Sequence, residues 1–116
     1  MRIEVRGRNT EVTDELRGRV EKRFAKVERQ VSRLASMEVE LSEERNPSIR
    51  ESQIAEATLY LKGVTLRARE ASDSMVHSVN HVADDLSRQV KRHRDKRRGR
   101  RDSAGIKGPP QPAEPA

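Results

Sequence analysis

Positively charged side chains are concentrated near the carboxyl end of the chain, at residues 87–101 (SRQVKRHRDKRRGRR). These fifteen positions hold nine of the 25 lysines and arginines and one acid, Asp95, whereas the other 101 residues hold 16 basic and 18 acidic side chains. Each lysine or arginine that neutralises a phosphate releases a condensed counterion and so raises affinity at low salt. The segment therefore favours electrostatic binding of a polyanion.

Histidine and aspartate side chains that can bind metal ions lie close together in the second half of the chain. His77 and His81 are four residues apart with Asp84 and Asp85 a turn further on, but Ser78 stands where a zinc protease motif requires Glu. The three side chains of His77, His81 and Asp84 also lie roughly opposite the apolar stripe of their helix, which is typical of a solvent-facing surface. We expect no metal site here.

Other catalytic signals are missing from the sequence. The chain has no cysteine, no nucleophile elbow and no phosphate-binding glycine loop. We predict that it is not an enzyme, and that it uses no cofactor and no small-molecule substrate. Its first residues lack an apolar leader segment, and no run approaches the roughly 18 apolar residues of a membrane span. The expectation is a soluble, cytoplasmic protein without a membrane partner.

The elements that position the charged residues follow the order strand, helix, three strands, helix. Apolar and polar residues alternate at 3–6, 37–41, 54–61 and 64–69, which predicts four half-buried strands. Lys62-Gly63 is a two-residue hairpin signal between the last two strands. The predicted fold class is α+β, a two-layer βαβββα sandwich with both helices on one face of a four-stranded sheet. The first helix would connect two parallel strands.

Each predicted helix carries one apolar stripe. Thr13 is the expected N-cap of the first helix, which should end near residues 30–34; its stripe comprises Leu16, Val20, Phe24, Val27, Val31 and Leu34. Ser72 or Asp73 is the expected N-cap of the second, whose stripe comprises Met75, Val79, Val82, Leu86 and Val90. Beyond Val90 the helix should continue to Arg98 and project past the sheet into solvent. We predict one domain at residues 1–98 and a disordered Gly/Pro-rich tail at 99–116.

Charges on the first helix are sorted into a basic stripe beside an acidic one. The basic stripe comprises Arg19, Lys22, Lys26, Arg29 and Arg33. A solvated face with flanking ion pairs, such as Arg17 with Glu21, would explain it equally well. Next to the basic half of the second helix, however, the stripe favours one cationic surface with a cleft between the helices. RNA is favoured over DNA as the partner, because DNA-reading motifs are absent. Tyr60 is the only aromatic on the sheet's exposed face, so we expect contact with phosphates and RNA shape rather than base stacking.

Four segments together resemble a known family, the ribosome hibernation-promoting factors or ribosome-associated translation inhibitors. They are residues 3–17 (IEVRGRNTEVTDELR), 20–29 (VEKRFAKVER), 63–68 (GVTLRA) and 74–98 (SMVHSVNHVADDLSRQVKRHRDKRR). The resemblance covers about residues 1–98 and implies a βαβββα fold like that of double-stranded RNA-binding domains. It implies binding to the small ribosomal subunit and the 70S ribosome, in the channel where messenger RNA and tRNAs meet 16S rRNA. Translation would be inhibited by occupancy, and the protein would be a monomer off the ribosome.

The resemblance also implies which residues bind RNA. The matching positions are Lys22, Lys26, Arg29, Arg88, Lys91, Arg92, Arg94, Lys96 and Arg97, with Arg8 a secondary candidate. The chain departs from many members at Gln30-Val31, where they carry an aromatic pair, and at Val76, where they often have Tyr; both are interpreted as repacking. The linker and second domain of the long members, which pairs ribosomes, have no counterpart, so the chain resembles the short forms.

Two alternatives share these features. A general RNA-binding or RNA-chaperone protein could use the same fold and basic surface without a ribosomal site. A structural ribosomal protein is disfavoured, because such proteins are usually basic throughout, whereas the residues outside 87–101 are slightly acidic.

Overall fold

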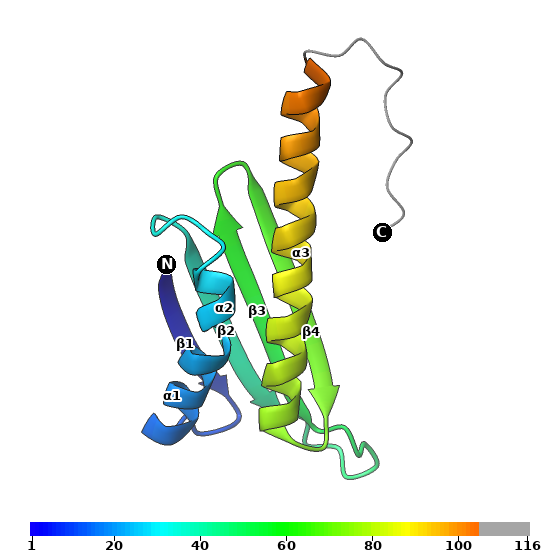
Figure 1. The fold of residues 1–116 in the computed structure, drawn as a ribbon. Helices are drawn as coiled ribbons and strands as arrows, with labels where there is room; N and C mark the ends of the chain where they lie inside the picture. The colour runs from blue at the N-terminus through cyan, green and yellow to red at the C-terminus, as the bar shows by residue number, and fades with distance from the viewer. Residues whose placement is uncertain (105–116) are drawn as a thin grey trace.

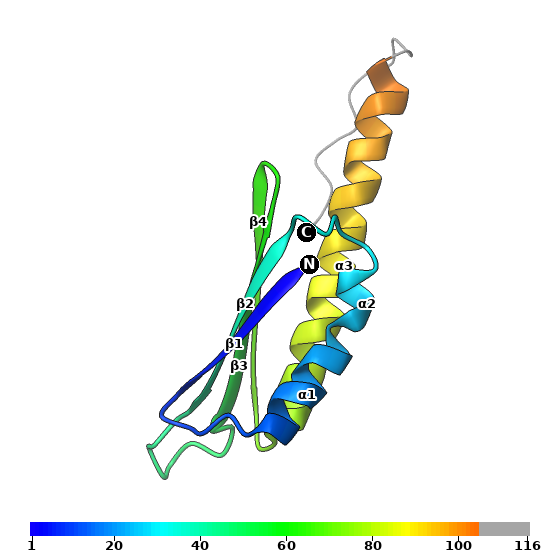
Figure 2. The same ribbon diagram turned by 90° about the vertical axis from the view of Figure 1, so that its left-hand side faces the viewer.

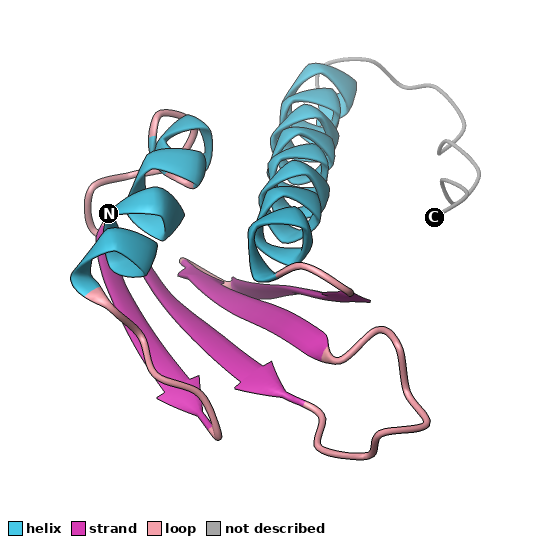
Figure 3. Cartoon of the chain, turned by 90° about the horizontal axis from the view of Figure 1, so that it is seen from below, coloured by secondary structure: helices cyan, strands magenta, loops and turns pink. Residues whose placement is uncertain are grey.

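The structure, a computed structural model, describes residues 1–104, with side chains as far as residue 96. Its elements are β1 (Arg2–Arg8), α1 (Asp14–Arg23), α2 (Ala25–Glu28), β2 (Ser36–Glu43), β3 (Gln53–Leu61), β4 (Val64–Ser72) and α3 (Met75–Ala104). The sheet forms one layer and the helices cover one of its faces, as Figures 1, 2 and 3 show. The predicted two-layer α+β sandwich is confirmed, with the first predicted helix divided into two.

The sheet has the strand order β1-β2-β3-β4. β1 and β2 are parallel, whereas β2 with β3 and β3 with β4 are antiparallel. Parallel neighbours need a crossover connection, which α1 and α2 supply as expected. Lys62 and Gly63 close the β3–β4 hairpin between the paired residues Leu61 and Val64, and Gly63 has a φ of 80° that suits glycine.

The core lies between the sheet and the helices and is almost entirely aliphatic. Strand residues alternate across the sheet, so that those facing the helices are fully buried: Val39, Leu41, Ala55, Ala57 and Leu59. The helices contribute Val20, Phe24, Val27, Val79, Val82 and Leu86 from their apolar faces. Phe24 is the largest buried side chain. The stripes predicted from helical spacing therefore do form the core, with one exception at the end of the first helix.

That exception is Leu34, whose side chain is 91% exposed rather than buried. α1 starts at its Thr13 cap, where Thr13 Oγ1 accepts a hydrogen bond from the Leu16 N–H at 3.1 Å, but it ends at Arg23. Phe24 interrupts the helix with φ −86° and ψ 0°, and the short α2 ends at Glu28. The prediction that Leu34 continues the stripe was wrong, because the chain beyond Glu28 no longer follows helical spacing.

The cap of α3 also differs from the prediction. Ser74, rather than Ser72 or Asp73, precedes the first turn, and its Oγ accepts a hydrogen bond from the His77 N–H at 3.4 Å. Ser72 instead accepts a hydrogen bond from the Ser74 N–H at 3.2 Å and donates one to the Ser74 carbonyl oxygen at 2.6 Å. The side chain of Ser72 thus stabilises the turn that precedes α3 instead of capping the helix.

α3 continues past its predicted end at Arg98 and runs through Gly99 to Ala104. A single glycine in a helix interior costs about 1 kcal/mol relative to alanine, and the arginines on both sides are good helix formers. The predicted boundary at residue 98 was therefore six residues too early for the helix. The rest of the predicted tail, residues 105–116, lies outside the described residues.

Candidate nucleic-acid interface

The predicted basic residues lie on helical segments that share one face of the sheet (Figure 2). Lys22 is in the last turn of α1, Lys26 is in α2 and Arg29 follows α2 directly; all three side chains are exposed. The exposed members on α3 are Arg88, Lys91, Arg92, Arg94 and Lys96. Arg97 belongs to α3, but its side chain lies outside the described ones.

A groove of about 330 Å³ runs between α1–α2 and α3. Its lining residues are Lys22, Arg23, Ala25, Lys26, Arg29, Asn80, Ala83 and Asp84. Ala25 and Ala83 have small side chains, which leaves room between the helices, while four cations and one acid surround that room. The structure therefore brings together the three basic residues predicted on the first helix, in the interhelical cleft that the sorted charges indicated.

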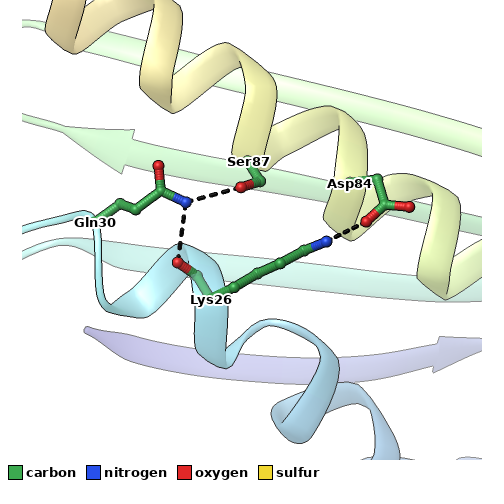
Figure 4. Close-up of polar contacts among 4 residues, drawn as sticks. All are labelled: Lys26, Gln30, Asp84 and Ser87. Carbon is green, nitrogen blue, oxygen red and sulfur yellow. Dashed lines mark hydrogen bonds and ion pairs between the residues drawn. The ribbon is translucent and has the colours of Figure 1, made fainter.

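One ion pair crosses the groove from α2 to α3. Lys26 Nζ donates a hydrogen bond to the Asp84 carboxylate, and the two side chains are 44% and 53% exposed (Figure 4). This hydrogen bond is the main cause that lowers the pKa of the Asp84 carboxyl; desolvation opposes it, and the charges of Lys26, Arg88 and His81 lower the pKa further. Asp84 is therefore an anion at neutral pH, and it lines the cationic groove.

The side chain of Gln30 fixes the end of α2 against α3. Its Nε2 donates to Ser87 Oγ at 2.8 Å and to the Lys26 carbonyl oxygen at 3.0 Å (Figure 4). The neighbouring Val31 packs against the core. The Gln30-Val31 departure from the family pattern is thus a polar bridge beside an apolar contact, and it holds the backbone of Lys26 at a set position beside α3.

The basic half of α3 differs from the groove because its cations occupy more than half of the helix circumference. At 100° per residue, the positions of Arg88, Lys91, Arg92, Arg94 and Lys96 spread over about 200° of the helix circumference. A spread of this width is compatible with a helix segment that has left the sheet, and Figure 1 shows the end of α3 extending beyond the strands. This half of α3 can contact phosphates on more than one side.

Other basic residues considered from the sequence do not line this groove. Arg8 is exposed at the end of β1, at the opposite end of the sheet from the projecting part of α3 (Figure 1). Arg19 forms an ion pair with Glu15 at 3.4 Å. Arg17 donates from Nη1 to the Val5 carbonyl oxygen at 3.4 Å rather than pairing with Glu21. The predicted basic stripe is therefore partly neutralised at its amino-terminal end.

Three polar or charged groove residues were not among the predicted binding residues: Arg23, Asn80 and Asp84. The side-chain oxygen of Asn80 is buried and has no hydrogen-bond partner among the described residues. The spacing of Asp84 on α3 was visible in the sequence, but its partner lies 58 residues away on another element. Patterns within one helix carry no signal for such a contact.

The histidine pair remains on the surface. His77 and His81 are exposed, with ring centroids 4.3 Å apart and the ring planes tilted by 46°. Within the part of the chain that the structure describes, no group of three or more histidine, cysteine or acidic residues is arranged to hold a metal ion. No helix in that part is long and apolar enough to cross a membrane.

A comparison with known protein families shows to which family the chain belongs. The family model described as "Sigma 54 modulation protein / S30EA ribosomal protein" matches residues 3–98. The chain belongs to this family. The match includes the basic segments of the helical layer and all of the sheet except Arg2, so it extends from β1 into the projecting part of α3.

Curated relatives in the S30EA family carry ribosome-related names. A "Ribosome hibernation promoting factor" of Salmonella typhimurium is 32% identical over 96 residues, covering 83% of this chain and 96% of the relative. A protein of the same name from Azotobacter vinelandii is 31% identical, covering 83% and 85%. A "Ribosome hibernation promotion factor" of Picosynechococcus is 29% identical over 87% of this chain, which spans only about half (53%) of that longer relative.

Solved structures support the same S30EA fold. The "Protein Y N-terminal domain" of Thermus thermophilus matches with a TM-score of 0.70 and 31% identity, over 80% of this chain and 99% of that one. A "ribosomal subunit interface protein" from Coxiella burnetii matches with a TM-score of 0.69 at 20% identity, over 82% and 99%. At that lower identity, the second likeness concerns the fold alone.

Proposed function

We propose that this protein is a ribosome-associated dormancy factor that binds the small ribosomal subunit and inhibits translation by steric occlusion. The names of its relatives supply the ribosome and the hibernation role. The single structural observation that carries the proposal is the cationic surface of the helical layer, where the groove residues Lys22, Lys26 and Arg29 lie on the same face of the sheet as the exposed basic residues of α3. The site of action we infer is the channel of messenger RNA and tRNA on 16S rRNA.

Charge distribution supports an electrostatic mode of binding. Residues 87–101 hold nine basic side chains against one acid, while the other 101 residues are slightly acidic. A protein of this kind is attracted to phosphate through one face, and its remaining surface does not add to non-specific adhesion. Occupancy of a cleft lined by rRNA requires no bond to be made or broken, so no catalytic residue is needed for the proposed inhibition.

The elongated end of α3 suits entry into a narrow, phosphate-lined channel. Its exposed cations occupy more than half of the helix circumference and would meet phosphates on more than one wall, whereas the sheet and the core would remain outside as a body that blocks other ligands. Phe24 is buried in the core and Tyr60 lies on a strand of the sheet. Recognition by this face would therefore depend on phosphate positions and RNA shape instead of base stacking.

Co-sedimentation with purified small subunits tests this function. We expect binding near one molecule per subunit, and loss of binding when messenger RNA and tRNA fill the channel beforehand. An inhibited translation reaction should recover when the same ligands are in excess. Equal affinity for small subunits and for arbitrary RNA duplexes would exclude a dedicated ribosomal site and would favour the general RNA-binding alternative.

The proposed partner also sets where and how the protein works. Binding to ribosomes would place it in the cytoplasm, and a one-to-one complex with the small subunit requires only a monomer. Analytical ultracentrifugation of the free protein, together with the stoichiometry on subunits, tests both parts of this inference. A stable dimer in solution that persists on the ribosome would contradict it.

A further inference from the structure

The groove between α2 and α3 contains a carboxylate where its other charged residues would attract an anion. Lys22, Arg23, Lys26 and Arg29 line this groove, and Asp84 is its one acidic lining residue. Asp84 is paired with one of these basic residues, because its carboxylate accepts a hydrogen bond from Lys26 Nζ. The chain thus supplies an oxyanion to its own cationic site.

Folding stability gives little reason for such a pair. Both side chains are about half exposed, at 44% for Lys26 and 53% for Asp84, and an ion pair in contact with water contributes little to the stability of a fold. Water can reach both partners, so the pair can open without unfolding the helices. The pair has a more direct effect on ligand binding in the groove. While the Lys26 ammonium group is paired with Asp84, its interaction with a second anion is weaker.

We propose that this groove is a phosphate-binding site that Asp84 occupies in the free protein, and that an RNA phosphate must displace Asp84 from Lys26 to bind there. The inference rests on the proposed function in so far as it takes RNA as the ligand. A carboxylate and a phosphate both present charged oxygens that accept hydrogen bonds from a lysine ammonium group. Asp84 is therefore the intramolecular competitor of the ligand.

The surroundings of the pair allow this exchange. The groove has a volume of about 330 Å³, and the alanines at positions 25 and 83 leave its centre open. Gln30 bonds to Ser87 Oγ and to the Lys26 carbonyl oxygen, which keeps α2 beside α3 independently of the ion pair. The cations would therefore remain in place after Asp84 has left Lys26.

The released carboxylate also has another partner nearby. Arg88 follows Asp84 by four residues on α3, a spacing at which oppositely charged side chains of one helix meet, and its charge already acts on Asp84. Asp84 can turn along its own helix toward Arg88 while a phosphate takes its place at Lys26. The exchange then leaves neither carboxylate nor lysine without a counter-charge.

A comparison of matched variants tests the exchange. Asp84→Asn removes the competing charge, and Asp85→Asn changes the net charge equally at the next position, which does not line the groove. Lys26→Gln and the double variant Lys26→Gln/Asp84→Asn complete the set. Affinity is measured by fluorescence anisotropy with an RNA duplex of about 16 base pairs, and in parallel with purified small subunits, each at several salt concentrations.

We expect Asp84→Asn to bind about fivefold more tightly than Asp85→Asn. Its salt dependence should steepen by about 0.9 in the slope of log K against log salt, because one more cation meets a phosphate. The gain should vanish in the Lys26→Gln background. Thermal melts of all four variants close to that of the wild type would show that the groove remains folded.

Two results would overturn the inference. Weaker binding by Asp84→Asn would mean that Asp84 positions Lys26 for the ligand, and equal binding by the two Asn variants would mean that only net charge matters. The proposed function is judged separately, by whether the wild-type protein prefers small subunits to the duplex. The groove inference is judged by the ratio between variants on either RNA, so that one can fail while the other stands.

Discussion

Ser78 donates a hydrogen bond from its Oγ to the backbone carbonyl oxygen of Gln53 at 2.7 Å, and so joins the first turns of α3 to the start of β3. The side chain of Ser78 is fully buried, and Ser72 Oγ lies 2.6 Å from the same hydroxyl oxygen. A polar contact of this kind sets where α3 begins on the sheet, whereas the apolar stripe of the helix sets only which face is buried.

Replacing Ser78 with alanine should destabilise the protein by about 1–3 kcal/mol, because the carbonyl of Gln53 would lose a buried hydrogen-bond donor. Urea denaturation measures the change. Ser48→Ala is the control, since Ser48 is exposed in the loop between β2 and β3, and it should leave the midpoint nearly unchanged. An equally small effect at both serines would contradict a structural role for the Ser78 contact.

Two leucines with opposite exposures test the end of the first helix. Leu86 is fully buried between α3 and the sheet, whereas Leu34 is 91% exposed. Leu86→Ala should cost about 2–5 kcal/mol of unfolding free energy, the usual range for a buried leucine, and Leu34→Ala should cost almost nothing. A substantial loss with Leu34→Ala would instead favour the longer helix that its sequence spacing indicated.

Charge reversal on the projecting part of α3 should separate binding from folding. Lys91→Glu/Arg92→Glu alters two exposed side chains beyond the buried Val90, so we expect binding to small subunits to fall by at least tenfold and the melting temperature to change by no more than a few degrees. Arg45→Glu/Arg50→Glu makes the same charge change in the exposed β2–β3 loop. Equal losses in both double variants would point to net charge rather than to α3.

The Lys26–Asp84 pair should leave a signature in acid. The pKa of Asp84 lies below its ordinary value of 3.8, chiefly because of the hydrogen bond from Lys26, so Lys26→Gln should raise it toward that value. Carbon-13 NMR of the Asp84 carboxyl measures the shift, and Lys62→Gln should not produce it. Because the folded-state pKa is lowered, the pair stabilises the fold at neutral pH, and this contribution disappears as the pH falls through the pKa of Asp84. An unchanged titration in Lys26→Gln would show that the pair does not persist in solution.

Glycines at two positions should respond in opposite directions to substitution by alanine. A Cβ at Gly18 on α1 would meet no atom within 4 Å, so Gly18→Ala should stabilise the helix by about 0.5–1 kcal/mol. A Cβ at Gly7 would lie 2.3 Å from the Thr10 carbonyl oxygen and 2.9 Å from Val12 Cγ2. Gly7→Ala should therefore destabilise the turn after β1. Thermal denaturation of both variants checks the pair, and a stabilised Gly7→Ala would contradict the close approach.

Periodicity in the sequence was sufficient for the elements but not for the contacts between them. Alternation at Val39, Leu41 and Leu59 correctly predicted strands with one buried face. Every second side chain of a strand points to the same face of the sheet, and in a two-layer fold only one face is covered. The stripe through Leu34 failed, because helical spacing has no meaning once the chain has left the helix at Glu28. The N-cap of α3 was misplaced for a related reason, since Ser72, Asp73 and Ser74 are all plausible caps and only the turn geometry separates them.

The candidate site was predictable to the same degree. Charge sorting on the first predicted helix grouped Lys22, Lys26 and Arg29 in one stripe, and the structure places all three in the groove beside α3. The pairing of Lys26 with Asp84 and of Gln30 with Ser87 depends on how two helices that are distant in sequence are set side by side on the sheet. Phe24 and Val27 belong to the same buried core cluster as Ala83 of α3, and a pattern within one helix does not show how residues from different helices meet in a core.

The continuity of α3 gives the molecule a fixed reach. Its 30 residues form one helix, of which the first half is anchored by buried side chains as far as Val90 and the last part carries on to Ala104. At 1.5 Å per residue, that last part spans about 20 Å. A force applied at its tip is transmitted as torque to the first half of α3, which Leu86 and Val90 hold against the sheet. The hydrophobic core therefore resists any load on the projecting end.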